Sequence, residues 1–123
     1  MRQRRLLVVD DIASNRELLR IMLTRMGDVA AVSVNGIGAI AAVPRRPFDV
    51  MPMNVKMREM DGGEAIQRIR ALGGQAGQVP ILALTAGASD ADQARSQAAG
   101  MNMHVSKPVG RARLAEVLAP LRG

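Results

Sequence analysis

The sequence predicts a single α/β domain in which a five-stranded parallel sheet is covered on both faces by five helices. Short apolar runs alternate with helical stretches along all 123 residues, and the connections between them are short. Such alternation is typical of βαβ units and a parallel sheet. Two of the runs, LLVV and ILAL, are continuously apolar, as strands buried on both faces require. With no internal linker or repeat, residues 1–123 are expected to form one domain.

The first half of the chain supplies two strands and two helices. LLVVD (6–10) is the first strand, and the helix that follows has apolar residues at helical spacing: Leu18, Leu19, Met22 and Met26. Ser14 and Glu17 have the spacing of a capping box at the start of this helix, and Gly27 can end it. VAAVSV (29–34) is the second strand. Residues 36–43 form a short helix closed by Pro44.

The second half continues the alternation. FDVMPMN (48–54) is the third strand, and residues 62–74 form an amphipathic helix. PILALT (80–85) is the fourth strand, with Pro80 at its tolerated first position. A helix opening at Ser89 comes next, and MNMHV (101–105) is the fifth strand. The last helix carries Leu114, Val117, Leu118 and Leu121.

The composition narrows the classes of function. The chain has no cysteine and no apolar run near the ~20 residues that span a bilayer, so a cytoplasmic protein without membrane contact is expected. The net charge is +6, and several arginines are predicted to gather where the strands begin: Arg2, Arg4, Arg5, Arg25, Arg45, Arg46 and Arg122. The simpler interpretation is a solvated surface that complements helix dipoles. The alternative is a docking patch for an acidic partner or nucleic acid.

Chemically active side chains follow the predicted strands at the opposite edge. Asp10 and Asp11 end the first strand, Asn54 ends the third, Thr85 ends the fourth, and Lys107 follows the fifth. In an open α/β sheet, ligands bind outside the carboxyl ends of the strands. Adjacent carboxylates suit a hard cation such as Mg²⁺. A lysine and a hydroxyl opposite them suit a phosphoryl group bound to that metal.

These motifs resemble the receiver domains of two-component response regulators over essentially the full length. The pieces that carry the resemblance are LLVVDD, SNRELLR, NGIGAI, MNVKM followed by EMDG, PILALTA, AAGMN and SKP. The resemblance implies a flavodoxin-like sheet in the order 2-1-3-4-5. It also implies that a histidine kinase passes a phosphoryl group to an aspartate beside bound Mg²⁺.

Carried over to this chain, the resemblance assigns roles to individual residues. Asp11 would bind the metal directly and Asp10 through water, with the backbone carbonyl of Lys56 as a further ligand. Thr85 and Lys107 would contact the phosphoryl group. The peptide bond between Lys107 and Pro108 would be cis, and Thr85 would couple to a switch residue at position 104.

The sequence departs from the family pattern around the acceptor. Position 54 holds asparagine, and a neutral amide cannot form an acyl phosphate. Pro52 lies inside a central strand, where it should cause a bulge or leave an acceptor short of a hydrogen bond. Arg58 replaces the usual proline of the next loop, and His104 replaces the usual aromatic switch residue. The cluster indicates a naturally degenerate site.

The lost carboxylate also bears on the metal. Asp10 and Asp11 carry the negative charge of the site, and Asn54 adds none, so Mg²⁺ is expected to bind more weakly than at an intact site. No organic cofactor is expected. GIGAIA (36–41) fits a loose dinucleotide pattern, but the preferred interpretation is a helix of small residues packing closely on the sheet.

The sequence therefore favours a pseudo-receiver, a non-enzymatic signalling module acting through protein contacts, most simply the helix 4–strand 5–helix 5 face used in the family. Its expected partners are a histidine kinase, a phosphotransfer or output domain, or a second copy of the chain. It is either a stand-alone protein or a piece of a hybrid kinase. One alternative is phosphorylation at Asp10, Asp11 or Asp49, or after deamidation of Asn54, which Val55 should slow. A nucleic-acid-binding role is the least supported.

Overall fold

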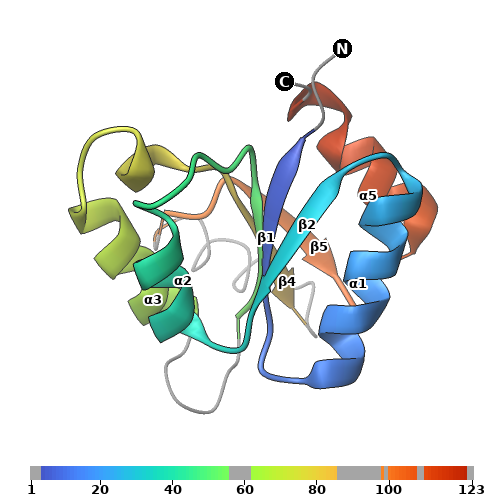
Figure 1. Ribbon diagram of the computed structural model, residues 1–123, viewed down its shortest axis with the longest axis horizontal. Helices are drawn as coiled ribbons and strands as arrows, with labels where there is room; N and C mark the ends of the chain where they lie inside the picture. Colours follow the sequence, from blue (N-terminus) through green and yellow to red (C-terminus); the bar gives the residue numbers. More distant parts are fainter. Residues whose placement is uncertain (1–3, 56–61, 86–97, 99, 108–109, 122–123) are drawn as a thin grey trace.

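Five parallel strands form one sheet in the order β2-β1-β3-β4-β5, as predicted. A computed structural model describes residues 4–55, 62–85, 98, 100–107 and 110–121 (Figure 1). The strands are β1 (Arg5–Val9), β2 (Val29–Ser33), β3 (Met51–Asn54), β4 (Ile81–Thr85) and β5 (Met103–Ser106).

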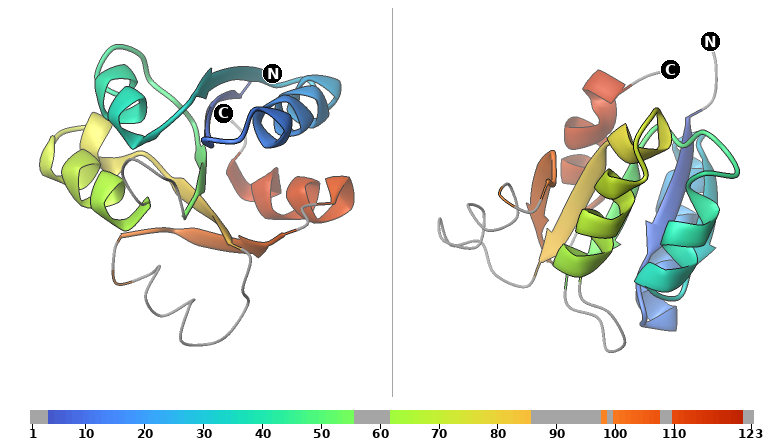
Figure 2. Two further views of the ribbon diagram at one scale, coloured as in Figure 1. Left: turned by 90° about the horizontal axis from the view of Figure 1, so that it is seen from below. Right: turned by 90° about the vertical axis from the view of Figure 1, so that its left-hand side faces the viewer.

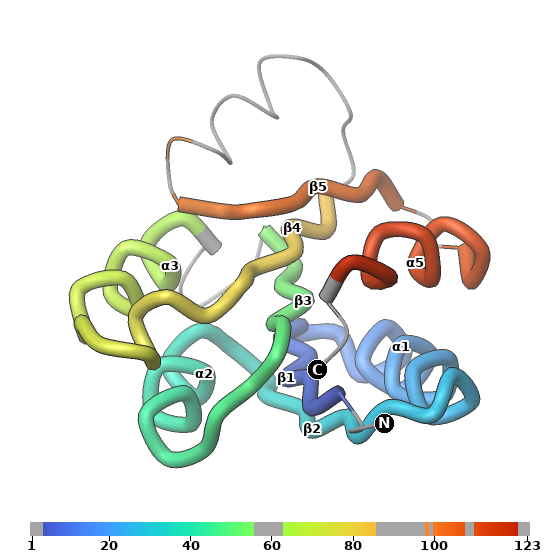
Figure 3. Tube along the Cα trace, turned by 90° about the horizontal axis from the view of Figure 1, so that it is seen from above, coloured from blue at the N-terminus to red at the C-terminus, as the bar shows by residue number. Residues whose placement is uncertain are grey.

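Helices cover both faces of the sheet (Figures 2 and 3). α2 (Gly36–Ala42) and α3 (Gly62–Ala71) lie on one face, and α1 (Ala13–Arg25) and α5 (Arg111–Leu118) lie on the other. Two short 3-10 turns, η1 (Ala76–Gln78) and η2 (Ala119–Leu121), complete the described elements. The predicted helix opening at Ser89 lies outside the described residues.

The core is divided by the sheet into two clusters. Leu6 and Val8 of β1 are buried in the cluster on the α1–α5 face, and Leu7 and Val9 are buried in the cluster on the α2–α3 face. Side chains that alternate along a strand point to opposite faces. Helices cover both faces of the sheet, so successive side chains of β1 are buried on one face or the other. This explains why β1 is a continuous apolar run rather than an alternation of apolar and polar residues.

The start of α1 differs from the prediction. Its N-cap is Ile12, which makes no side-chain cap, so Ser14 lies inside the helix and the predicted capping box with Glu17 is wrong. The carboxylate of Asp10 takes part of the capping role, because its Oδ1 accepts the Ile12 amide at 2.9 Å. The end of α1 is as predicted: Gly27 follows it with φ of 90°, a conformation that glycine adopts readily.

All five strands differ from their predicted bounds by at least one residue, and two of them begin at least two residues later than predicted. β3 begins at Met51 rather than at residue 48, and β5 begins at Met103 rather than at residue 101. Before β5, Asn102 uses its side chain for tertiary bonding: its Oδ1 accepts the amide of Ile81 and an Nη2–H of Arg70, each at 2.9 Å.

Pro52 interrupts one ladder of the sheet without causing a bulge. β3 pairs with β4 at every position from Met51 to Asn54. Toward β1, the described pairs are Leu6 with Val50 and Val9 with Met53, at the same residue offset. The register is therefore unbroken, and the missing N–H of Pro52 falls on the β1 side. The predicted gap in the ladder is confirmed, and the predicted bulge is not needed.

Close packing explains the small residues of α2. A Cβ added at Gly38 would lie 2.4 Å from Oγ of Ser33 in β2, so a larger residue here would have to displace the Ser33 hydroxyl. Asn35 caps the helix by accepting the Gly38 amide at 2.9 Å. This geometry supports the packing interpretation of GIGAIA.

Arg70 joins three segments at the edge where the strands begin. Its guanidinium donates to the carbonyls of Gly77 and Val79 at 2.9 and 2.7 Å and to that of Gly100 at 2.7 Å. Burial lowers the pKa of this guanidinium below its ordinary value, yet arginine stays charged at neutral pH. Arg70 thus fixes η1 and the entries to β4 and β5, a role that helical spacing did not reveal.

Candidate functional site

Three of the predicted site residues meet at the carboxyl edge of the sheet, the lower end in Figure 1. Asp10 directly follows β1, Asn54 is the last residue of β3, and Lys107 directly follows β5. Parallel strands bring these ends to one edge although the residues are far apart in sequence. The sequence prediction of their proximity is confirmed by the contacts between them.

Asn54 bridges the other two side chains. Lys107 Nζ donates to Asn54 Oδ1 at 2.8 Å, and Asn54 Nδ2 donates to Asp10 Oδ1 at 3.4 Å. Only 5% of Asn54 is exposed. An amide can accept from a cation and donate to a carboxylate at once, so it suits both neighbours without adding charge.

Asp10 is the most constrained member of the site. It is fully buried, and its backbone carbonyl accepts from Arg16 Nη1 at 2.8 Å. Its Oδ1 accepts from Ile12 and Asn54, whereas its Oδ2 has no hydrogen-bond partner within the described parts of the chain. Oδ2 lies 4.0 Å from Lys107 Nζ, which supplies the compensating charge. A buried carboxylate oxygen without a donor is a position that a cation or a water would satisfy.

A second pair lies beside this trio. Thr85 Oγ1 and His104 Nε2 are 2.8 Å apart and share a hydrogen bond. The pair is linked to the trio by the backbone, because the Lys107 amide donates to the Thr85 carbonyl at 2.7 Å. Both side chains are half-buried. The structure therefore joins Thr85 and His104, the two residues predicted to form the switch.

The remaining predicted site residues lie apart from these contacts or outside the described residues. Asp11 follows Asp10, is half-buried and takes part in a further interaction. Lys56, Arg58 and Pro108 lie outside the described residues, so the carbonyl ligand, the loop substitution and the cis peptide bond stay predictions. Asp49 precedes β3 and lies at the opposite edge, where its Oδ2 accepts the Arg5 amide at 2.7 Å. Its position does not favour it as an alternative acceptor beside Lys107.

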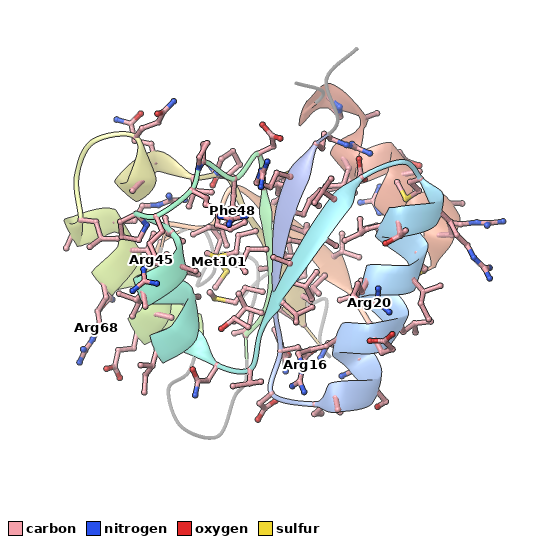
Figure 4. All side chains as sticks on the ribbon, in the orientation of Figure 1. Arg16, Arg20, Arg45, Phe48, Arg68 and Met101 are labelled. Atoms are coloured by element: carbon pink, nitrogen blue, oxygen red, sulfur yellow. The ribbon has the colours of Figure 1, made fainter. Side chains whose placement is uncertain are left out.

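Arg16 is a site residue that sequence reasoning missed. It lies on α1 and fixes the carbonyl of Asp10, and Figure 4 shows it near the start of that helix. The only sequence signal is a basic residue one turn into the helix after the acids, which is too common to assign a role. The described residues hold no group of three or more His, Cys, Asp or Glu side chains that could bind a metal. A cation at this edge would depend on Asp10, Asp11 and neutral oxygen atoms.

Comparison with known sequences gives an independent result. The family described as response regulator receiver domain matches residues 6–119. The sensor protein GacS of Pseudomonas syringae pv. syringae is 35% identical over 121 residues, which cover 97% of this chain and 13% of that protein. The sensor histidine kinase GacS of Pseudomonas protegens is 33% identical, with the same coverage. The chain thus spans 13% of the length of these curated relatives.

Comparison with solved structures agrees. The receiver domain of the sensor histidine kinase PA1611 from Pseudomonas aeruginosa, solved with a magnesium ion in its active-site cleft, has a TM-score of 0.88 and 32% identity, covering 98% of each chain. The chemotaxis protein CheY4 of Vibrio cholerae has a TM-score of 0.91 and 27% identity, covering 98% of this chain and 100% of that one. No helix in the described part of the chain is long and apolar enough to cross a membrane.

Proposed function

The chain belongs to the response regulator receiver domain family, and on that premise we propose that it is a pseudo-receiver that signals by protein contact without accepting phosphate at position 54. The observation that carries the proposal is the bridge from Lys107 through the Asn54 amide to Asp10. An amide nitrogen holds its lone pair in resonance with the carbonyl and is a very poor nucleophile. The bridge also occupies the lysine that would otherwise meet a phosphoryl group.

The charge of the site supports a fixed state. Asp10 and Asp11 with Lys107 sum to −1, and the amide between them adds nothing. A carboxylate at position 54 would stand beside the buried Asp10 carboxylate, and close carboxylates repel unless a proton or a cation intervenes. Asparagine removes that repulsion, so no cation is needed to offset a carboxylate at position 54.

Mg²⁺ binding is proposed to be weak. The unpartnered Oδ2 of Asp10 fits a cation, and a bound Mg²⁺ would offset the charge of Asp10 and Asp11. Against this, the Asn54 oxygen already accepts from Lys107 at 2.8 Å, and an ammonium close to the site opposes a second cation. The magnesium ion in the PA1611 receiver domain is a property of that protein.

The partners proposed are proteins of two-component systems. The similarity to GacS supports a histidine kinase or a phosphotransfer domain, either within one longer chain or as a separate protein. The proposed contact surface is the helix 4–strand 5–helix 5 face. Of its elements, β5 and α5 are described, and the switch residue His104 lies on β5.

Intact-protein mass spectrometry after incubation with Mg²⁺ and acetyl phosphate tests the central proposal. Asn54→Asp is the matched control, because it restores the acceptor and changes nothing else. The expected result is a phosphoryl adduct on the variant and none on the natural chain.

Two other outcomes are informative. An adduct on the natural chain would contradict the proposal and support an alternative acceptor, which peptide mapping would locate. No adduct on either protein would mean that Pro52 or Arg58 also disables the site, so the loss of function would extend beyond one side chain.

A further inference from the structure

A pocket of 360 Å³ opens at the amino edge of the sheet, between the loop after α2 and the turn η1. Its position is distinct from the trio of Asp10, Asn54 and Lys107, because Asp49 of the pocket precedes β3 and Asn54 ends it. Figure 4 shows Arg45 and Phe48 on the side of α2 and α3, away from Arg16. Small-molecule pockets commonly measure about 300–1,000 Å³, so the volume suits a small ligand.

The floor of the pocket is apolar. Val43 and Val79 are buried in the α2–α3 core, and Phe48 and Ala76 pack half-buried against it. Phe48 is the only aromatic residue of the chain. Its ring offers a flat apolar surface on which a planar group can stack.

The rim of the pocket is cationic. Arg45 and Arg46 are exposed and line it, and neither guanidinium has an ionic partner in the part of the chain that the structure describes. By contrast Arg4, Arg20 and Arg68 each pair with an acid. Among the described residues that line the pocket, Asp49 is the only acid, and its Oδ2 accepts the Arg5 amide. The rim therefore carries a net positive charge.

The wall of the pocket is held in place before any ligand arrives. Arg70 donates to the carbonyls of Gly77 and Val79, which fixes η1 and the residue that leads into β4. A preformed wall lowers the ordering cost of binding. Gln75 on this turn adds an amide that can both donate and accept at the rim.

We propose that this pocket binds a small phosphorylated ligand that carries a planar ring, with a nucleoside diphosphate as the simplest example. The two guanidiniums would bind phosphate oxygens in the forked geometry that arginine favours. The planar group would lie on Phe48, and Gln75 would contact its polar edge. Such a ligand would act at the edge opposite the degenerate acceptor, independently of phosphorylation at position 54.

Titration with ADP in the absence of Mg²⁺ tests the proposal. Calorimetry measures the affinity, and amide NMR shifts locate the site. Adenosine and pyrophosphate are titrated separately, so that the ring and the phosphates are judged apart. We expect ADP to bind at least about tenfold more tightly than either fragment, with shifts at Gln75, Ala76 and Asp49. Absence of binding up to ~1 mM ADP, which corresponds to about −4 kcal/mol, would overturn the proposal, as would shifts confined to the residues around Asn54.

Matched variants identify the groups responsible. Arg45→Gln with Arg46→Gln is expected to weaken ADP binding at least about tenfold. Arg25→Gln with Arg111→Gln removes the same charge from exposed positions on the α1–α5 face, outside the pocket lining, and should change the affinity less than about twofold. Phe48→Leu keeps an apolar floor and should abolish the advantage of ADP over pyrophosphate. Equal losses in the two double variants would reduce the effect to net charge and overturn the pocket as the site.

Discussion

At the carboxyl edge of the sheet Lys107 donates to Asn54 and Asn54 donates to Asp10, whereas at the amino edge Arg45 and Arg46 face a pocket without an ionic partner among the described residues. Burial accounts for the difference. Asp10 and Asn54 are 0% and 5% exposed, and buried polar groups need partners. The two arginines are exposed, and water satisfies them at little cost.

The two edges differ in whether their charged groups are paired within the protein. The carboxyl edge keeps the positions of a receiver site, but its hydrogen bonds are now made within the protein. The amino edge keeps charges that no described side chain pairs. Exposed cations without an acidic partner attract anions, so we expect a small anion to bind at the amino edge.

The largest expected effect is a loss of stability on replacing Arg70, which connects η1 with the residues before β4 and β5 at the amino edge. Arg70→Met should lower the free energy of unfolding by about 2–4 kcal/mol, because the carbonyls of Gly77, Val79 and Gly100 lose a charged donor. Urea denaturation followed by circular dichroism measures it, with the exposed Arg68→Met on the same helix as the control. A loss no greater than that of the control would show that the amino edge does not depend on this clamp.

A smaller effect is expected from restoring the acid at the carboxyl edge. Without metal, Asn54→Asp should lower stability by about 1–3 kcal/mol, because a second carboxylate then meets buried Asp10. Millimolar Mg²⁺ should recover most of that loss and should shift the natural chain far less. Thermal melting with EDTA and with Mg²⁺ gives the stability, and isothermal titration gives the affinity. Equal Mg²⁺ affinities for the two proteins would contradict the role assigned to the amide.

The smallest effect concerns the pair beside the site. His104→Leu and Thr85→Val each remove one partner of the hydrogen bond between Thr85 Oγ1 and His104 Nε2. A double-mutant cycle should give a coupling energy of about 0.5–1.5 kcal/mol. Chemical denaturation of the four proteins measures it. Strictly additive losses would mean that the two residues are neighbours without a stabilising bond, and the switch pairing would lose its support.

The sheet could be predicted from the apolar runs that mark its strands. Most of the site could be predicted because its residues lie at the ends of those strands. Apolar runs such as ILAL mark the strands, and a parallel sheet brings Asp10, Asn54 and Lys107 to one edge whatever the loops do. Local side-chain competition was harder to anticipate. Ser14 has the spacing of a cap, but Asp10 Oδ1 reaches the Ile12 amide and the helix begins at Ala13.

Features that depend on distant loops could not be predicted. Arg70 fits a helical pattern like its neighbours, and its carbonyl partners belong to segments whose approach is set by tertiary packing. The same holds for the pocket, which needs the loop after α2 to meet η1. Strand starts and helix ends predicted that Arg4, Arg5, Arg25, Arg45 and Arg46 lie toward the amino edge, but not that Arg45 and Arg46 line a hollow there.

Pro52 leaves a seam in the centre of the sheet. β1 with β2 forms one half and β3 to β5 the other, and the described pairs that join the halves are Leu6 with Val50 and Val9 with Met53. At one end of the seam Asp49 bonds across to Arg5, and at the other end Asn54 bonds across to Asp10. Under a pulling or shearing load the domain should part along this line. The hydrogen bonds made by the Asp49 and Asn54 side chains would then resist separation of the two halves, one at each edge of the sheet.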